Sequence, residues 1–335
     1  MVQSNQEQKR LNALQPAISG NQTQNTFLVT GSSGFLGRAL VGRLLSRGHA
    51  VRTARPLKEA RDASSGPSSI RMDASVQEWR EAMEGCSGVF HLAWSTVPST
   101  ANMDPVADLE TNLAGTVRML EALRSRPRVT VVFVSSGGTV YGTADTLPIL
   151  ETHPLQPQTA YGASKVSVEH YMMLYRRTWG LDTRIVRLSN PFGPGQNIKG
   201  QLGAASIFAA RALADEKIEI WGDGSTIRDY VYIDDAINGF LAAMLTPNQR
   251  FGTLDPIFNV GSGRGISLRE LISVLRTVLE KPVEVDFKPS RGFDVPSNVL
   301  DISRARTLLG WTPTVTFEEG LARYITYLKE HAQPA

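Results

Sequence analysis

The sequence predicts an α/β protein: a Rossmann-type doubly wound parallel sheet followed by a smaller C-terminal α/β lobe. Short apolar runs alternate with segments of helical period between residues 26 and 190, and this alternation is typical of a parallel sheet covered on both faces. A glycine-rich turn, residues 31–37, separates the first apolar run from the first helical segment. Such a turn is the usual phosphate-binding element of doubly wound sheets.

The expected elements of the first domain are short and bounded by turn residues. The strand runs are rich in Val, Phe and Thr, as strands buried on both faces are. Gly48 is expected to end the first helix. The expected strands are 26–30, 50–53, 89–93, 129–134 and 183–188, and the expected helices are 38–45, 111–123 and 161–179.

Composition divides the chain into three parts. Residues 1–25 contain ten Asn or Gln and no apolar period, so we expect a flexible N-terminal arm. Residues 26–190 form the expected Rossmann domain. From residue 191, loops rich in Gly and Pro and a helical segment at 267–279 indicate the second lobe, 191–335, with some segments returning to the Rossmann domain.

Composition also limits the function. No apolar run approaches the ~20 residues of a membrane span, and the net charge of +3 is not gathered into basic runs. Neither a membrane nor nucleic acid is therefore expected as a partner. Cys86 is the single cysteine of the chain, which excludes an intramolecular disulfide and a cysteine-rich metal site. We expect a cytoplasmic protein that uses no metal.

Two motifs carry chemistry. Gly31, Gly34 and Gly37 stand between a strand and a helix, where glycines let the backbone approach a pyrophosphate at the helix N-terminus. Tyr161 and Lys165 are four residues apart on an expected helix and share one face. An ammonium group beside a phenol favours the phenolate, which can take a proton from a sugar hydroxyl while hydride leaves the same carbon.

These motifs resemble the extended short-chain dehydrogenase/reductase superfamily. The glycine loop reads G-x-x-G-F-x-G rather than G-x-G-x-x-G, and the Tyr-x-x-x-Lys pair follows it at the family's spacing. Further matches resemble the NAD-dependent epimerase/dehydratase family, and within it most of all the UDP-glucose 4-epimerases. These matches are residues 187–194, 222–235, 259–263 and 291–296.

The resemblance implies a nicotinamide dinucleotide cofactor. Asp73 stands where the family binds the adenine amine, and Arg55 stands where an acid would bind the ribose of NAD. Because an arginine there can accept a 2′-phosphate, NAD is expected and NADP stays open. The other implied cofactor-binding residues are Gly31, Gly34, Phe35, Leu36, Gly37, Ala74, Leu92, Ala93 and Lys165.

The resemblance also implies a nucleotide-sugar site in the second lobe. Guanidinium groups suit a diphosphate. The resemblance implies that Asn190 contacts the phosphates and that Asp294 binds the uridine ribose. Asn298 stands where some family members carry a bulky side chain, and its modest size would leave room for an N-acetyl group. The implied substrate-binding residues are Ser136, Asn190, Arg228, Arg291 and Asp294.

The segment Ser135–Gly142, Ser-Ser-Gly-Gly-Thr-Val-Tyr-Gly, departs from the family pattern. The hydroxyl that shares the reacting oxygen with the tyrosine normally stands at the position of Gly137. In an extended segment, Thr139 faces the same side as residue 137 and is the better substitute. Ser136, a bound water, and Tyr161 alone stay open. The segment also lacks the acids that the family's dehydratases and decarboxylases carry there.

Together these inferences predict a nucleotide-sugar 4-epimerase that acts on a UDP-hexose or UDP-N-acetylhexosamine through a transient 4-keto intermediate. Its catalytic residues would be Tyr161, Lys165 and Thr139. One alternative is an NADP-dependent nucleotide-4-ketosugar reductase, motivated by Arg55. A less favoured one is a catalytically silent nucleotide-binding regulatory protein, motivated by Gly137. The family also implies a homodimer formed through the two long helices.

Overall fold

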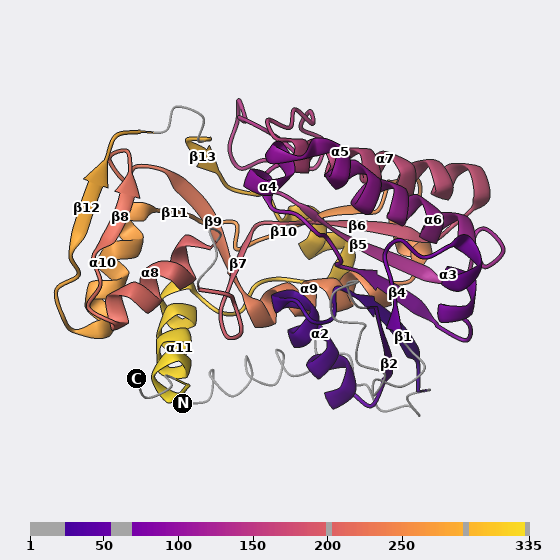
Figure 1. The fold of residues 1–335 in the computed structure, drawn as a ribbon, viewed down its shortest axis with the longest axis horizontal. Helices are drawn as coiled ribbons and strands as arrows, with labels where there is room; N and C mark the ends of the chain where they lie inside the picture. The colour runs from indigo at the N-terminus through magenta and orange to yellow at the C-terminus, as the bar shows by residue number, and fades with distance from the viewer. Residues whose placement is uncertain (1–23, 55–68, 199–202, 291–294, 332–335) are drawn as a thin grey trace, which may run out of the picture.

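The centre of the protein is a seven-stranded sheet with strand order β10-β6-β5-β4-β1-β2-β3 (Figure 1). The computed structural model describes residues 24–54, 69–198, 203–290 and 295–331, and all six strand pairs of this sheet are parallel. The strand order reverses between β1 and β4, as in a doubly wound sheet. The predicted fold class is therefore confirmed. The strands are β1 (Thr26–Thr30), β2 (Ala50–Ala54), β3 (Ser69–Ile70), β4 (Gly88–His91), β5 (Thr130–Ser136), β6 (Thr183–Leu188) and β10 (Ile257–Val260).

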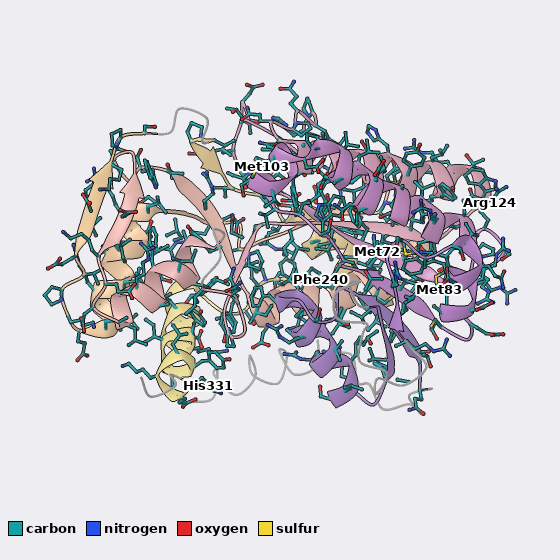
Figure 2. All side chains as sticks on the ribbon, viewed as in Figure 1. Met72, Met83, Met103, Arg124, Phe240 and His331 are labelled. Atoms are coloured by element: carbon teal, nitrogen blue, oxygen red, sulfur yellow. The ribbon has the colours of Figure 1, made fainter. Side chains whose placement is uncertain are left out.

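Helices cover both faces of the sheet, and successive residues of β1 point into different cores. Phe27 and Val29 belong to one buried cluster together with Phe240, which Figure 2 labels, whereas Leu28 belongs to the other. This alternation follows from the two-residue repeat of a strand. The helices are α2 (Phe35–Ser46) and α9 (Ile233–Leu245) on one face, and α3 (Val76–Ala82), α6 (Ala114–Leu123) and α7 (Ala160–Trp179) on the other.

The second half of the chain builds a smaller lobe and also returns to the first sheet. β10 pairs with β6, and α9 packs against β5 and β6. The lobe holds a four-stranded sheet, in which β7 and β13 pair parallel and β11 pairs antiparallel with β9, and a two-stranded sheet. Its elements are β7 (Asn190–Phe192), α8 (Ala204–Leu213), β8 (Ile218–Trp221), β9 (Ile227–Tyr232), β11 (Gly265–Ser267), α10 (Leu268–Leu279), β12 (Val285–Lys288), β13 (Ser297–Asn298) and α11 (Phe317–Glu330).

Most elements expected in the first domain occur within two or three residues of their expected bounds. Two differ in an informative way. The strand expected at 89–93 ends at His91, because the next two backbone N–H groups turn to bond the hydroxyl of Thr30. The helix expected at 111–123 begins as a π-helical turn. The remaining helical segments are α4 (Pro98–Met103), α5 (Pro105–Asp108), η1 (Leu109–Leu113), η2 (Asn248–Phe251) and η3 (Ala305–Leu309). Among the described helices, none is long and apolar enough to cross a membrane.

A buried ion pair fastens α7 to the sheet. The Nη2 and Nε atoms of Arg187, on β6, donate to the Glu169 carboxylate of α7 at 2.6–3.2 Å. The Ser135 hydroxyl, on β5, donates to the same carboxylate. The Arg187 Nη1 atom donates to the Tyr141 hydroxyl and to the Glu151 carbonyl, both at 2.9 Å. The ion pair thereby joins a helix, two strands and the loop after β5 at the edge where parallel strands end.

Candidate active site

The glycine loop after β1 closes on itself so tightly that side chains are excluded. Gly31 has φ +69°, and a Cβ atom there would lie 2.8 Å from the backbone nitrogen of Ala93. A Cβ atom on Gly37 would lie 2.0 Å from the Gly31 carbonyl oxygen, and one on Gly34 3.2 Å from it. Phe35 then opens α2. Only glycine permits this turn, which the sequence analysis assigned to a pyrophosphate.

Helix α2 begins at this loop with its first N–H groups open. Its N-cap is Gly34, which offers no side-chain cap, and its first turn, with Phe35 and Leu36, contains no acidic residue. The N-terminal N–H groups of a helix and its dipole attract anions. A dinucleotide pyrophosphate therefore fits the loop both sterically and electrostatically.

A buried hydrogen-bond chain fixes the wall opposite the loop. The Thr116 hydroxyl donates to a backbone carbonyl, so it accepts from His91 Nε2 at 2.9 Å. His91 Nδ1 then accepts from the Thr30 hydroxyl at 2.9 Å, whose oxygen accepts the N–H groups of Leu92 and Ala93 at 3.1 and 3.0 Å. Burial lowers the pKa of His91 to about 3, so the ring is neutral, as this chain requires. Leu92 and Ala93 thus line the loop with their amides already bonded.

The residues expected around adenine are only partly described. Asp73 follows β3, and Arg71 donates to both of its carboxylate oxygens at 2.9 and 2.6 Å. The Arg71 guanidinium lowers the pKa of Asp73, and Ala74 beside it is buried. Arg55 lies outside the described residues. The role of Asp73 toward the adenine amine stays a prediction.

Tyr161 and Lys165 occupy the first turns of α7, which Thr159 caps. The Lys165 Nζ atom donates to the Val134 carbonyl at 2.9 Å and lies 5.6 Å from the centre of the Tyr161 ring. It also lies 3.7 Å from the centre of the Trp94 ring, a residue that the sequence analysis missed. The available signal was its position: Trp94 directly follows Ala93, the residue against which Gly31 packs.

Burial sets the charge states of this pair. It lowers the pKa of Lys165 to about 7, against the pull of the Glu169 and Asp108 carboxylates. Burial, and secondarily Asp108, raises the pKa of Tyr161 above its ordinary value. The phenol therefore keeps its proton at neutral pH in the site as it stands, and it can act as a base only when further positive charge is brought beside it.

The turn after β5, residues 137–139, is not extended. The Thr139 amide bonds back to the Ser136 carbonyl at 3.3 Å, so the expectation of an extended segment here is wrong, and the role of Thr139 as the substitute hydroxyl stays a prediction. A Cβ atom on Gly137 would lie 2.6 Å from Cδ1 of the buried Leu300. The Thr139 carbonyl oxygen lies 2.8 Å from where a Cβ on Gly162 would stand, directly after Tyr161. The Thr139 Oγ1 atom is buried and makes no hydrogen bond within the described chain.

The expected substrate residues of the second lobe gather on its four-stranded sheet. Asn190, on β7, donates to the Asp229 carbonyl at 2.9 Å, and Arg228, on β9, donates to the Val295 carbonyl at 2.8 Å. Asn298 pairs with Arg228 in the strand register and donates to the Gly137 carbonyl at 3.0 Å. The half-buried Ser136 ends β5. Arg291 and Asp294 lie outside the described residues.

Comparison with known proteins identifies the family. A model of the NAD dependent epimerase/dehydratase family matches residues 27–261. A UDP-glucose 4-epimerase of Mycolicibacterium smegmatis is 36% identical over 317 residues, covering 91% of this chain and 99% of that protein. A dTDP-4-dehydro-6-deoxyglucose reductase of Escherichia coli is 30% identical, covering 91% and 98%. The crystal structure of a Thermotoga maritima UDP-glucose 4-epimerase with UDP-glucose matches with a TM-score of 0.82 at 31% identity, covering 92% and 100%.

The chain belongs to the NAD-dependent epimerase/dehydratase family. The family membership confirms the predicted resemblance, the prediction that the chain is an enzyme, and NAD as its cofactor. Within this family, the glycine loop and the open start of α2 are the elements of this chain that would hold the pyrophosphate of NAD. That Lys165 and Tyr161 lie beside the nicotinamide of NAD stays a prediction.

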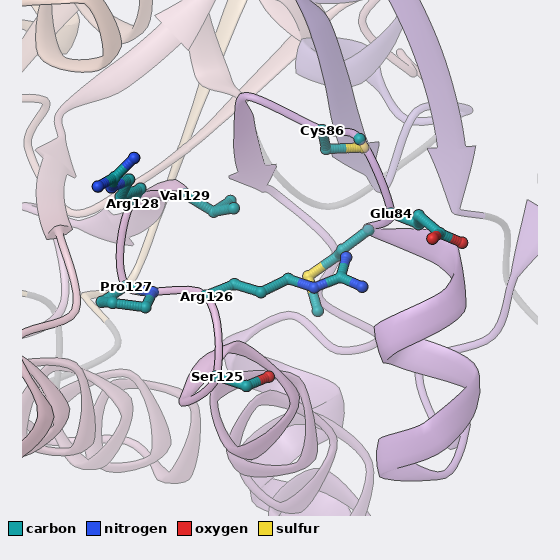
Figure 3. Close-up of a pocket in the computed structure, with 9 residues that line it drawn as sticks. Glu84, Cys86, Ser125, Arg126, Pro127, Arg128 and Val129 are labelled. Atoms are coloured by element: carbon teal, nitrogen blue, oxygen red, sulfur yellow. The ribbon is translucent and has the colours of Figure 1, made fainter.

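A cavity lies at the end of the sheet where β4 and β5 begin. It has a volume of about 500 Å³ and opens between the turn before β4 and the turn before β5 (Figure 3). Figure 3 shows Arg126 extended across it, whereas Arg128 points away. Because these turns precede the strands, the cavity is separated by the length of the sheet from the family's site at the strand carboxyl ends.

Replacing Gly37 by alanine should abolish cofactor binding. The added Cβ would overlap the Gly31 carbonyl, so the loop must open and the affinity for NAD should fall on the order of 100-fold or more. Gly42→Ala is the matched control, since its Cβ meets nothing within 4 Å on the same helix, and it should bind NAD normally and melt slightly higher. Titration calorimetry on cofactor-stripped protein measures both. Equal NAD affinities of the two variants would show that the loop does not carry the cofactor.

Proposed function

We propose that this enzyme is a UDP-sugar 4-epimerase. The observation that carries the proposal is the pair of the half-buried Tyr161 and the buried Lys165 on α7, together with a glycine loop that fits a pyrophosphate and a catalytic turn, 137–139, that offers a hydroxyl and no acid. Bound NAD supplies a hydride acceptor that can also return the hydride, together with positive charge. With no acid on the turn to protonate a leaving group, the chemistry stops at oxidation and re-reduction.

Three residues of the chain are proposed to act at the sugar C4 hydroxyl, each with a different role. Tyr161 takes the proton of the hydroxyl when hydride leaves the same carbon, and gives the proton back when hydride returns to the other face of the sugar. Lys165 supports the phenolate with its charge. The Thr139 Oγ1 atom, which makes no hydrogen bond in the described chain, is proposed to hydrogen-bond the reacting oxygen in place of the hydroxyl that position 137 lacks.

The proposed substrates are UDP-hexoses and UDP-N-acetylhexosamines. The side chain of Asn298 is buried, and its amide donates to the Gly137 carbonyl. The side chain is thus held against the catalytic turn, and we propose that it leaves room for an N-acetyl group. Arg228 and Asn190 on the adjoining strands are proposed to bind the diphosphate. The similarity to an E. coli ketosugar reductase keeps the reductase as the alternative that the first experiment must exclude.

The defining experiment offers the full-length enzyme UDP-galactose, UDP-glucose, UDP-GalNAc and UDP-GlcNAc, each without cofactor, with NAD and with NADPH. The expected result is interconversion of each C4 pair without net consumption of cofactor, because the hydride is returned in every turnover. A nucleotide 4-keto sugar is offered with NADPH in a parallel assay, and its reduction with stoichiometric loss of NADPH, without interconversion of the C4 pairs, would assign the chain to the reductases instead. Activity on UDP-glucose with none on either N-acetylated sugar would remove the inference from Asn298.

Thr139→Ala should lower kcat by about 10- to 100-fold, the worth of one hydrogen bond to a charged oxygen. Tyr161→Phe should lower it by about 10³-fold or more through loss of the base. Thr143→Ala, an exposed threonine in the same loop, should leave kcat unchanged. Steady-state kinetics on UDP-galactose measure all three. If Ser136→Ala slows the enzyme and Thr139→Ala does not, the hydroxyl belongs to Ser136.

We further propose that the enzyme is a homodimer formed through α7 and its neighbours. Large apolar side chains stand exposed on helices that pack together along one side of the molecule, and Figure 2 shows Met103 at the outer surface of α4. This many exposed apolar side chains on one face are typical of an interaction surface. They are Met103, Val106, Leu109, Tyr171 and Leu174.

The double variant Val106→Glu/Leu174→Glu should be a monomer, because two carboxylates per protomer would have to be desolvated at the interface. Light scattering after size-exclusion chromatography measures the mass. Leu45→Glu, an equally exposed leucine on α2, should leave the dimer intact. A wild-type protein that is monomeric at micromolar concentration would rule the proposal out.

A further inference from the structure

Three aromatic rings surround the ammonium group of Lys165. The Nζ atom lies 3.7 Å from the ring centre of Trp94, 4.7 Å from that of Phe133 and 5.6 Å from that of Tyr161. The rings also contact one another: Trp94 meets Tyr161 edge-on at 5.7 Å and Phe133 at 6.0 Å. Lys165 is 3% exposed. Such a cage replaces lost hydration with attraction between the cation and the ring faces.

The indole of Trp94 has no other polar task in the described chain. Its Nε1 atom is buried without a hydrogen-bond partner in the described chain, so packing against the apolar core and contacts with the neighbouring rings and Lys165 hold the side chain. Its distance to Nζ is the shortest of the three rings. We propose that Trp94 is a positioning residue for Lys165: its ring face holds the buried ammonium in place and keeps it charged beside Tyr161.

Two carboxylates, a neutral imidazole and a backbone carbonyl also face Lys165. The Glu169 carboxylate of α7 is engaged by Arg187, and one oxygen of the Asp108 carboxylate of α5 is bonded by Asn112. His91 on β4 is neutral, because burial lowers its pKa to about 3. Among the described residues, the ammonium donates to a backbone carbonyl, that of Val134. The ring faces, with the indole of Trp94 nearest, thus add to the attraction that the Glu169 and Asp108 carboxylates exert on the ammonium.

The first test follows the pH profile of kcat and rests on the proposed function. Burial lowers the pKa of Lys165 to about 7, so the ammonium is lost as the pH rises and the rate falls on the alkaline side. Trp94→Leu removes the attraction that favours the ammonium and should move this alkaline limb down by about one pH unit. Trp94→Phe keeps a ring face and should move it less. An unchanged limb in Trp94→Leu would overturn the proposal.

The second test needs no substrate and so separates this inference from the proposed function. Urea unfolding of wild type, Trp94→Leu, Lys165→Met and the double variant gives the coupling between the two side chains in the full chain. The coupling should stabilise the fold at about pH 6, where Lys165 is charged, and disappear at about pH 9, where it is neutral. Coupling that is absent, or equal at both pH values, would reduce Trp94 to a packing residue. If the coupling depends on pH but the protein epimerises no UDP-sugar, the proposed function would be refuted while the proposed role of Trp94 would be supported.

Discussion

The buried guanidinium of Arg187 is the constraint on which the site depends. A charge with a side chain 3% exposed is tolerable only when it is paired and its donors are satisfied, and removing one partner from such a pair costs about 3–5 kcal/mol. Glu169 satisfies it from α7, one helical turn beyond Lys165 and two beyond Tyr161 on the same face. A slip or rotation of α7 would break this pair. The ion pair therefore fixes the register of the helix against β5 and β6, and with it the position of Tyr161 and Lys165.

The same arrangement decides how the ammonium of Lys165 is stabilised. Glu169 lies one turn away from it, but three hydrogen bonds from Arg187 and one from Ser135 engage its carboxylate. Arg187 therefore holds both carboxylate oxygens of Glu169 in place. If Glu169 instead paired directly with Lys165, it would compete with Tyr161 for the positive charge. Aromatic faces such as that of Trp94 favour a cation without neutralising it. The charge of Lys165 thus remains available to the phenol.

The sequence was sufficient for the features that short-range chemistry determines. The strand at 26–30, the long helix after Thr159 and the glycine loop all follow from local period, capping and turn preference. Two features depended on contacts between distant residues. The turn at 137–139 is shaped by residues of the second lobe, and Trp94 acquires its role from Lys165, about 70 residues away. No spacing rule predicts such pairs, because the sheet brings the ends of β4, β5 and α7 together only after folding.

Gly137 is explained by how the second lobe closes on the catalytic turn. The buried Asp229 carboxylate of β9 accepts the N–H groups of Ser262 and Leu300 at 2.7 and 3.2 Å, which ties the lobe's central strand to the segment after β13. That segment places the Leu300 side chain where a Cβ of residue 137 would be, while the Asn298 amide holds the carbonyl of the same glycine. A serine at 137 would have to displace a fully buried leucine. The absence of a side chain at residue 137 therefore has a structural reason in the docking of the second lobe.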